Sequence, residues 1–172
     1  MSEILRYTWG DSSLGDFLVA ASEKGVVAFE FVDRRDAAMD ALRIRFPDAV
    51  LEADGKALSE LVVMLRALIE RPERMPRIAL DPRGDDYQKT VWSIVQEIPA
   101  GETTTYGALA AKLGSRDARD VTAAIAANAI ALLIPCHRVV KKDGSLSGYR
   151  WGTKRKRTLL ERERRAVSFQ LA

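Results

Sequence analysis

The sequence is poor in the two residues that most often cross-link small proteins, with one cysteine and one histidine among 172 residues. A single cysteine excludes a disulfide within the chain, and one Cys with one His cannot supply the usual four-ligand zinc site. No apolar run approaches the roughly 20 residues that a membrane-spanning helix needs. Residues 1–6 lack the basic-then-apolar pattern of a signal peptide. We therefore expect neither a secreted, nor a membrane-spanning, nor a zinc-finger protein.

Charge is unevenly distributed along the chain, although the net charge is only +3. Residues 1–82 carry a charge of −4 and residues 83–135 a charge of −1. Residues 136–165, called the basic block below, hold 11 basic and 3 acidic side chains, a charge of +8. A solvated helix face is the plain interpretation of such a segment. Because it begins at the only cysteine, a cationic surface around a reactive group is the alternative, and it favours nucleic acid as partner.

Local patterns predict an α+β fold in two parts. Three short β-rich runs separated by turn residues predict an antiparallel meander, at residues 4–9, 15–21 and 26–31. Apolar residues at helical spacing predict helices at residues 37–45 and 56–70. A Pro-rich stretch at residues 71–84 has the composition of a linker. We predict an N-terminal α/β domain at residues 1–82 and a mostly helical C-terminal domain at residues 83–172.

The C-terminal part begins with three predicted helices. The first has an apolar face formed by Tyr87, Val91, Ile94, Val95 and Ile98. The second and third cover residues 106–113 and 117–127 and are joined by Gly114, Ser115 and Arg116. Two short helices with a tight Gly-containing turn fit a helix-turn-helix, although many helical hairpins share this pattern.

The third of these helices has two distinct faces. Ala118, Val121, Ala124 and Ile125 form a stripe that would pack inward. Arg119 lies about 200° around the helix from Val121, and its neighbours on the outer face are Thr122, Ala123 and Ala126. Small side chains around one long cation would allow close approach to a nucleic-acid backbone. An ordinary Ala-rich helix with a solvated arginine is the alternative.

The only cysteine and the only histidine are adjacent. An apolar segment, residues 131–135, leads directly into Cys136 and His137. A lone cysteine is commonly a small buried hydrophobe, whereas a nucleophilic cysteine needs a base or a positive field. His137 can be that base through a bridging water, because adjacent side chains point apart. The positive charge is expected from Arg138, Lys141 and Lys142.

A carboxylate is then needed to orient His137, following the logic of catalytic triads. Glu163 lies three and four residues after Leu160 and Leu159, on the apolar face of the predicted C-terminal helix, whereas Glu161 lies toward solvent. Because a buried carboxylate is costly without a partner, Glu163 is the candidate. A surface salt bridge to an arginine is the alternative role.

Two segments carry a resemblance to a known family. Residues 135–140, PCHRVV, resemble the active-site signature of the O6-alkylguanine-DNA alkyltransferases, and residues 143–152, DGSLSGYRWG, are similar to the alkyltransferase domain of bacterial Ada proteins. The similarity extends over residues 87–165, and the spacing from Cys136 to Glu163 also agrees. The resemblance implies an RNase H-like N-terminal domain and a helix-turn-helix that enters the minor groove.

The resemblance also implies residue roles. Cys136 would accept the alkyl group, with His137 as its water-linked base, Glu163 orienting His137, and Asn128 as the hinge between helix-turn-helix and active-site loop. Tyr106 would help rotate the target nucleotide and would donate to the base, and Arg119 would fill the gap left by that base. Further DNA contacts would come from Thr122, Ala123, Ala126 and Arg138. The base pocket would be lined by Val139, Tyr149, Arg150 and Trp151, although Trp151 can instead anchor the core.

We therefore expect a single-turnover repair protein that moves a methyl group from O6 of guanine in double-stranded DNA to Cys136. No cofactor or metal is implied, and we expect a monomer in the cytoplasm, associated with the nucleoid in a bacterium. Activity on O4-alkylthymine is left open. Many family members have Asn-Pro-Val-Pro where this chain has Asn-Ala-Ile-Ala at residues 128–131, so we expect a less rigid loop. The alternatives are a non-catalytic sensor of alkylated DNA, against which Cys136 argues, and a Cys-His hydrolase.

Overall fold

An antiparallel meander forms the N-terminal half, as predicted. In the computed structural model the described residues are 1–114, 117–146 and 148–171, with side chains described up to residue 169. Strands β1 (Ile4–Gly10), β2 (Asp16–Ala21) and β3 (Val26–Val32) pair antiparallel in chain order. A fourth strand, β4 (Val50–Ala53), pairs parallel to β1, which gives the sheet order β3-β2-β1-β4. The sequence analysis missed β4 because this short edge strand has no buried, alternating face.

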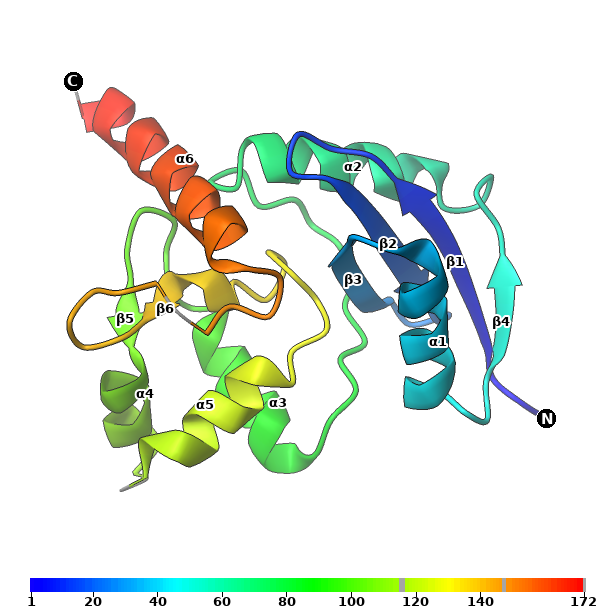
Figure 1. Ribbon diagram of the computed structural model, residues 1–172, viewed down its shortest axis with the longest axis horizontal. Helices are drawn as coiled ribbons and strands as arrows, with labels where there is room; N and C mark the ends of the chain where they lie inside the picture. Colours follow the sequence, from blue (N-terminus) through cyan, green and yellow to red (C-terminus); the bar gives the residue numbers. More distant parts are fainter. Residues whose placement is uncertain (115–116, 147, 172) are drawn as a thin grey trace.

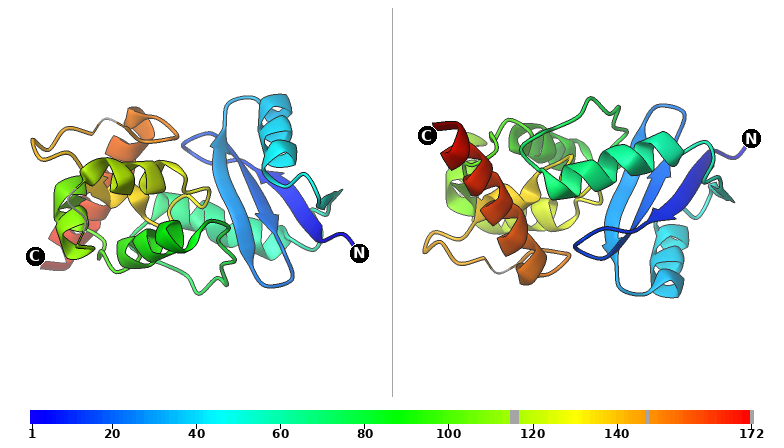
Figure 2. Two further views of the ribbon diagram at one scale, coloured as in Figure 1. Left: turned by 90° about the horizontal axis from the view of Figure 1, so that it is seen from below. Right: turned by 90° about the horizontal axis from the view of Figure 1, so that it is seen from above.

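Two helices cover opposite faces of this sheet (Figure 2). They are α1 (Arg35–Arg45) and α2 (Ser59–Glu70). On the α1 side, Leu42 and Phe46 pack in a separate core cluster with Leu18 and Ala28. On the α2 side, the main core cluster contains Leu65 together with residues of the C-terminal half. The two halves of the chain therefore share their larger core.

The C-terminal half is mostly helical, and its helices are α3 (Asp86–Val95), α4 (Tyr106–Lys112), α5 (Ala118–Ala126) and α6 (Thr153–Leu171). Val91, Trp92 and Val95 form the buried face of α3, and the indole nitrogen of Trp92 donates to the Ala124 carbonyl at 2.8 Å. Tyr87, predicted on this face, is 39% exposed. Helix α3 thus supports α5 from behind.

Helices α4 and α5 are the two helices of the predicted helix-turn-helix, and they lie side by side in Figure 1. Gly114 follows α4 with a φ of +71°, a conformation that favours glycine. The predicted turn residues Ser115 and Arg116 lie outside the described residues, as does Ser147.

A two-stranded parallel ladder links the helix-turn-helix to the segment around the cysteine. Strand β5 (Thr104–Thr105) pairs with β6 (Val139–Val140), so Thr104 faces Val139. Because Tyr106 follows β5 directly, the ladder carries it to the residues that follow Cys136. This pairing joins segments 35 residues apart, and local sequence patterns gave no indication of it.

Candidate active site

Cys136 ends a buried apolar segment and begins a short 3₁₀ turn, η1 (Cys136–Arg138). Residues 130–134 are all buried, and Cys136 itself is 4% exposed. Leu132 has a φ of 59°, in the left-handed region that residues other than glycine rarely adopt. Such a conformation persists only where the surrounding structure holds it. The segment therefore fixes the thiol inside the protein.

Asn128 connects the end of α5 to this segment. Its side chain is buried, and its amide nitrogen donates to the Ile134 carbonyl at 3.1 Å and lies 3.3 Å from the Cys136 Sγ atom. Its Oδ1 atom accepts from the Ile130 N–H at 2.9 Å. Asn128 thus bonds to α5 through its backbone N–H, which donates to the Ile125 carbonyl, and to the buried loop and the thiol through its side chain. This is the position at which the hinge was predicted.

His137 and Glu163 form a fully buried pair, with Nε2 2.7 Å from Oε1. Burial raises the pKa of Glu163, but hydrogen bonds from His137 and Arg138 outweigh it, and the resulting pKa lies below the usual value. An ionised carboxylate only accepts, so the histidine carries its proton on Nε2. Burial lowers the pKa of His137 and keeps the ring neutral.

The other ring nitrogen of His137 is the basic one. Nδ1 is buried and has no hydrogen-bond partner within the described part of the chain. A neutral imidazole with Nε2–H bound to a carboxylate has its lone pair on Nδ1, free to accept a proton. Glu163 faces inward from α6 and Glu161 is exposed, as the helix spacing predicted. The predicted orienting pair is therefore assembled in the structure.

Arg138, which was predicted as a DNA contact, lies in the interior with its guanidinium bound to other parts of the protein. Its side chain is 5% exposed, its Nη2 atom lies 2.8 Å from Oε1 of Glu163, and Nη1 donates to the Ile98 carbonyl at 2.8 Å. A guanidinium enclosed in this way cannot reach a phosphate. Its charge instead balances Glu163 in the interior, where an unpaired carboxylate would be costly.

The positive charge near the thiol comes from residues other than those predicted. Burial raises the pKa of Cys136, opposed by the hydrogen bond from Asn128 and by the charges of Lys156 and Arg150. The prediction had named Arg138, Lys141 and Lys142. The first of these is paired with Glu163, and the two lysines are exposed on the turn after β6.

Lys156 is the functional candidate that the sequence analysis missed. Its side chain is fully buried, and Nζ donates to the Val139 carbonyl at 2.6 Å and lies 6.0 Å from the ring centroids of Tyr106 and Tyr149. Burial lowers its pKa, and the nearby Cys136 opposes this. The signal was available: Lys156 precedes Glu163 by seven residues, two helical turns, and so shares its buried face.

Two of the predicted base-pocket residues, Val139 and Tyr149, lie next to this lysine. Tyr149 is 8% exposed, and its hydroxyl has no hydrogen-bond partner among the residues that the structure describes. The Trp151 ring meets it edge-on at 5.3 Å and belongs to the main core cluster. Gly148 has a φ of +88°, and a Cβ atom there would lie 3.7 Å from the Tyr106 hydroxyl. Burial, followed by the charge of Cys136, raises the pKa of Tyr106 and keeps its hydroxyl protonated as a donor.

Comparisons with known proteins cover both halves of the chain. The family described as 6-O-methylguanine DNA methyltransferase, ribonuclease-like domain, matches residues 5–82, and the same family's DNA binding domain matches residues 86–165. The inducible methylated-DNA--protein-cysteine methyltransferase of Bacillus subtilis is 35% identical over 158 residues, covering 89% of this chain and 87% of that protein. The chain belongs to the 6-O-methylguanine DNA methyltransferase family.

Solved structures and longer relatives of this methyltransferase family extend the comparison. The crystal structure of the Mycobacterium tuberculosis O6-methylguanine methyltransferase has a TM-score of 0.77 and 32% identity, covering 94% of this chain and 93% of that one. The regulatory protein ada of Salmonella typhimurium is 42% identical over 160 residues, which are 92% of this chain and 45% of that protein. The chain thus spans about half the length of this relative.

In this methyltransferase-family chain, α5 presents the predicted outer face. Val121, Ala124 and Ile125 are buried, whereas the Arg119 side chain is 90% exposed. Arg119 pairs with Asp117, the residue that caps the helix, at 2.8 Å. Thr122, Ala123 and Ala126 are exposed beside it. The Thr122 hydroxyl donates to the Ala118 carbonyl at 2.8 Å, so its methyl group and the lone pairs of its oxygen are left for an outside contact.

Much of the basic block is bound within the protein, which corrects its interpretation as one cationic surface. Besides Arg138, the engaged cations include Arg150, Arg155, Lys156 and Arg162. Arg155 donates to the Leu14 carbonyl at 2.8 Å, and Arg162 donates to the Ile69 carbonyl at 2.6 Å. These arginines attach α6 to the N-terminal half, where carbonyl oxygens at strand and helix ends need donors.

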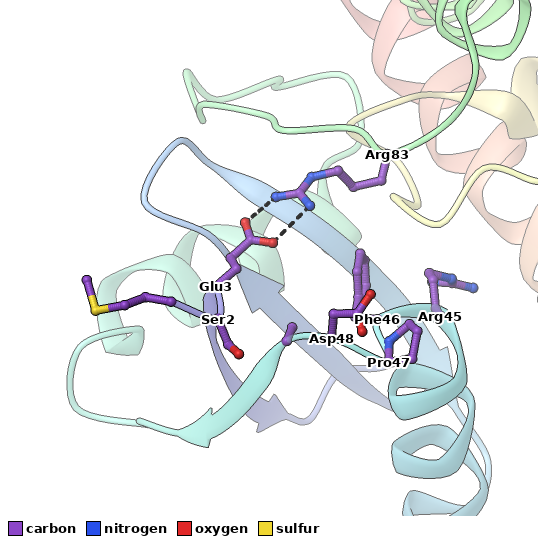
Figure 3. Close-up of a pocket in the computed structure, with 9 residues that line it drawn as sticks. Ser2, Glu3, Arg45, Phe46, Pro47, Asp48 and Arg83 are labelled. Atoms are coloured by element: carbon purple, nitrogen blue, oxygen red, sulfur yellow. Dashed lines mark hydrogen bonds and ion pairs between the residues drawn. The ribbon is translucent and has the colours of Figure 1, made fainter.

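A surface hollow of about 590 Å³ lies mostly on the N-terminal half and shares no lining residue with the candidate active site. Figure 3 shows Arg83 paired with Glu3, and one of the two hydrogen bonds that Arg83 donates there is 3.1 Å long. Arg83 also pairs with Asp81. Arg45 pairs with Glu30 at 3.2 Å. None of the predicted site residues lines this hollow.

No group of three or more His, Cys, Asp or Glu lies together as metal ligands would within residues 1–114, 117–146 and 148–171. Over the same residues, no helix is both long and apolar enough to cross a bilayer.

Proposed function

We propose that this protein repairs DNA directly by moving a methyl group from O6 of guanine to Cys136. The observation that carries the proposal is the buried constellation of Cys136, His137 and Glu163, in which Glu163 binds Nε2 of His137 and no described residue binds Nδ1. The named relatives, methylated-DNA--protein-cysteine methyltransferases, support it. A relative from Mycobacterium tuberculosis was solved in complex with DNA, which supports DNA as the partner.

The target base has to leave the duplex before it can reach Cys136. The thiol is 4% exposed, and the guanine O6 atom is stacked and paired within the duplex. Extruding a nucleotide costs a few kcal/mol of stacking and pairing. Arg119, which projects from α5 next to small side chains, would occupy the vacated space and offset part of this cost. Tyr106 would press on the backbone of the rotated nucleotide.

The transfer itself is a displacement at the methyl carbon. His137 accepts the thiol proton at Nδ1 through a water, and the Cys136 sulfur forms the new S–C bond while the C–O6 bond breaks. The electron pair of that bond passes to the guanine, which takes a proton from the Tyr106 hydroxyl. Tyr106 regains a proton from water and His137 releases the thiol proton to water, so both groups end in their starting state. Lys156 stabilises the negative charge that moves from sulfur to base, because a cation counts for more in a buried site.

The product sets a limit of one transfer per molecule. A thioether on Cys136 has no easy route to hydrolysis, and the chain has no second cysteine that could exchange with it. The reaction needs only the protein, water and the alkylated base. We infer that the protein acts as a monomer in the cytoplasm, on double-stranded DNA at sites set by damage rather than by sequence. The regulatory activity named for the longer ada relative is not proposed for this chain.

Cys136→Ser tests the proposal. The variant should accept no labelled methyl group from duplex DNA that contains O6-methylguanine, because a serine hydroxyl is a far weaker nucleophile than a thiol. Its affinity for the same duplex should stay close to that of the unmodified protein, because α5 and the exposed lysines are unchanged. Label on the Cys136→Ser protein would contradict the proposal.

A further inference from the structure

The N-terminal half holds the loop that leads to Cys136 through one residue of β3. Phe29 donates its N–H to the Ala129 carbonyl at 2.8 Å, and its own carbonyl accepts from the Ala131 N–H at 2.8 Å. Because β3 is an edge strand, its outer N–H and C=O groups need partners. A proline at residue 131 would lack the N–H that makes the second bond. This chain, without the Asn-Pro-Val-Pro prolines, therefore ties its loop to β3 by hydrogen bonds.

The next residue of β3 is a carboxylate in an otherwise buried strand. The Glu30 side chain is 15% exposed, and a carboxylate in such a place is costly unless it is partnered. Its Oε2 atom lies 3.2 Å from Nη1 of Arg45, at the end of α1. Its Oε1 atom lies 3.0 Å from Nη2 of Arg150, which belongs to the other half of the chain. Glu30 therefore holds two guanidinium groups in place.

Arg150 extends this contact to the active-site segments. Its Nη1 atom lies 3.3 Å from the Asn128 carbonyl and 3.4 Å from the Ala126 carbonyl, the last residue of α5. Its guanidinium lies 5.7 Å from the ring centroid of Trp151. One side chain thus touches the carboxylate of β3, the end of the DNA-facing helix and the hinge, while its backbone follows Tyr149 in the pocket loop.

We propose that Glu30 is a positioning residue for alkyl transfer, which fixes the pocket loop and the Asn128 hinge around Cys136 through Arg150. The proposal rests on the proposed function. Phe29 and Glu30 are consecutive residues of β3. The backbone of Phe29 fixes residues 129–131, before the cysteine, and the side chain of Glu30 fixes Arg150, after it. A partly exposed ion pair adds little stability. Its main effect is geometric, and small displacements of reacting groups strongly reduce rates.

Two substitutions of Glu30 test this. Glu30→Ala removes the side chain, and Glu30→Gln removes the charge but keeps the shape. Glu70→Gln is the matched control, because it removes another ion pair between the halves, with Arg162 at 3.8 Å, that touches neither active-site segment. The first measurement is the single-turnover transfer rate at saturating methylated duplex. Both Glu30 variants should transfer roughly 10-fold more slowly, with unchanged duplex affinity and unchanged melting temperature, and the control should match the unmodified protein.

The second measurement does not depend on alkyl transfer. Amide hydrogen exchange in residues 129–134 and 148–152 should be faster in both Glu30 variants and unchanged in Glu70→Gln. Unchanged amide exchange in the Glu30 variants would overturn the proposal. If the unmodified protein transfers methyl groups, an unchanged transfer rate in the Glu30 variants would also overturn it. If the unmodified protein transfers none, the proposed function fails, and the exchange measurement alone decides the role of Glu30.

Discussion

Glu163 has two buried partners, and they serve the site in different ways. Its hydrogen bond with His137 keeps the proton of the ring on Nε2 and leaves Nδ1 as the base. Its ion pair with Arg138 holds the 3₁₀ turn against α6. Both contacts require an ionised carboxylate, and the lowered pKa of Glu163 provides it at neutral pH.

The pH dependence of transfer follows from two buried groups. Burial lowers the pKa of His137 below its usual 6.5 and raises the pKa of Cys136 above its usual 9.0. Between these values His137 is a neutral base and Cys136 a thiol, so the single-turnover rate should be constant from about pH 7 to pH 9. The rate should fall only at a pH below 6.5, where the pH reaches the lowered pKa of His137 and Nδ1 becomes protonated. A rate that rises steadily through the alkaline range would instead indicate that the Cys136 thiol loses its proton to solvent as the pH rises, and it would remove His137 as base.

Arg138→Met separates a structural arginine from a DNA contact. The substitution leaves Glu163 without its guanidinium partner, and breaking one side of a buried ion pair costs about 3–5 kcal/mol. Urea unfolding should show a loss of that order. The salt dependence of DNA binding should be unchanged, since the side chain is 5% exposed. If Arg138→Met left the free energy of unfolding unchanged and made the salt dependence of DNA affinity shallower, Arg138 would be a phosphate contact after all.

Single residues were predictable where helix spacing decided their direction. Glu163 and Glu161 were separated correctly because Leu159 and Leu160 define the buried face of α6. The same spacing indicates Lys156, but a lysine is ordinarily assigned to solvent, and its burial depends on the Val139 carbonyl from a different segment. Glu30 was missed for the same reason, because its partners Arg45 and Arg150 come from distant parts of the chain.

Among the elements, α5 combines a buried stripe with an exposed cation. Val121, Ala124 and Ile125 fix the rotation of the helix against the core, and this rotation determines where Arg119 points. The Arg119 side chain is 90% exposed, so it adds little to the fold and is available to an outside partner. Its ion pair with Asp117 lies at the surface, where such pairs are weak and exchange readily.

Arg119→Ala tests the wedge role of α5. Repair of O6-methylguanine in duplex DNA should slow by roughly 10- to 100-fold, the equivalent of a few kcal/mol of stacking left uncompensated. Reaction with the free base O6-methylguanine should be unaffected, because no stack is opened. Arg43→Ala, which removes a surface arginine from the N-terminal half, is the control. Equal losses on duplex and free base would exclude Arg119 from base extrusion.

Elements with a strong local pattern were predicted, and those made by distant pairing were not. The meander follows from β-rich runs separated by turn residues. Helices α3 to α5 follow from apolar residues at helical spacing, with Gly or Pro at the helix ends. Strands β5 and β6 have two residues each, and they exist because Thr104–Thr105 meets Val139–Val140. No local window contains both segments, yet this ladder is what carries Tyr106 to the cysteine.

Over the whole molecule, the two halves act as one body. The main core cluster includes Phe29 and Leu65 from the N-terminal half together with Val91, Ile134 and Leu159 from the C-terminal half. Cations of α6 add hydrogen bonds across the same boundary, among them those of Arg155 and Arg162. The charge of +8 on residues 136–165 therefore did not predict the charge of the surface, because a count along the chain does not reveal which cations are bound inside.

The stoichiometry of methyl transfer tests the central claim most directly. The protein is incubated with an excess of duplex DNA that contains O6-methylguanine, then digested, and the methylated peptides are identified by mass spectrometry. The account predicts one methyl group per chain, on the peptide that contains Cys136, with no increase as the excess of DNA grows. Repeated turnover by each molecule, or a methyl group on another residue, would contradict it.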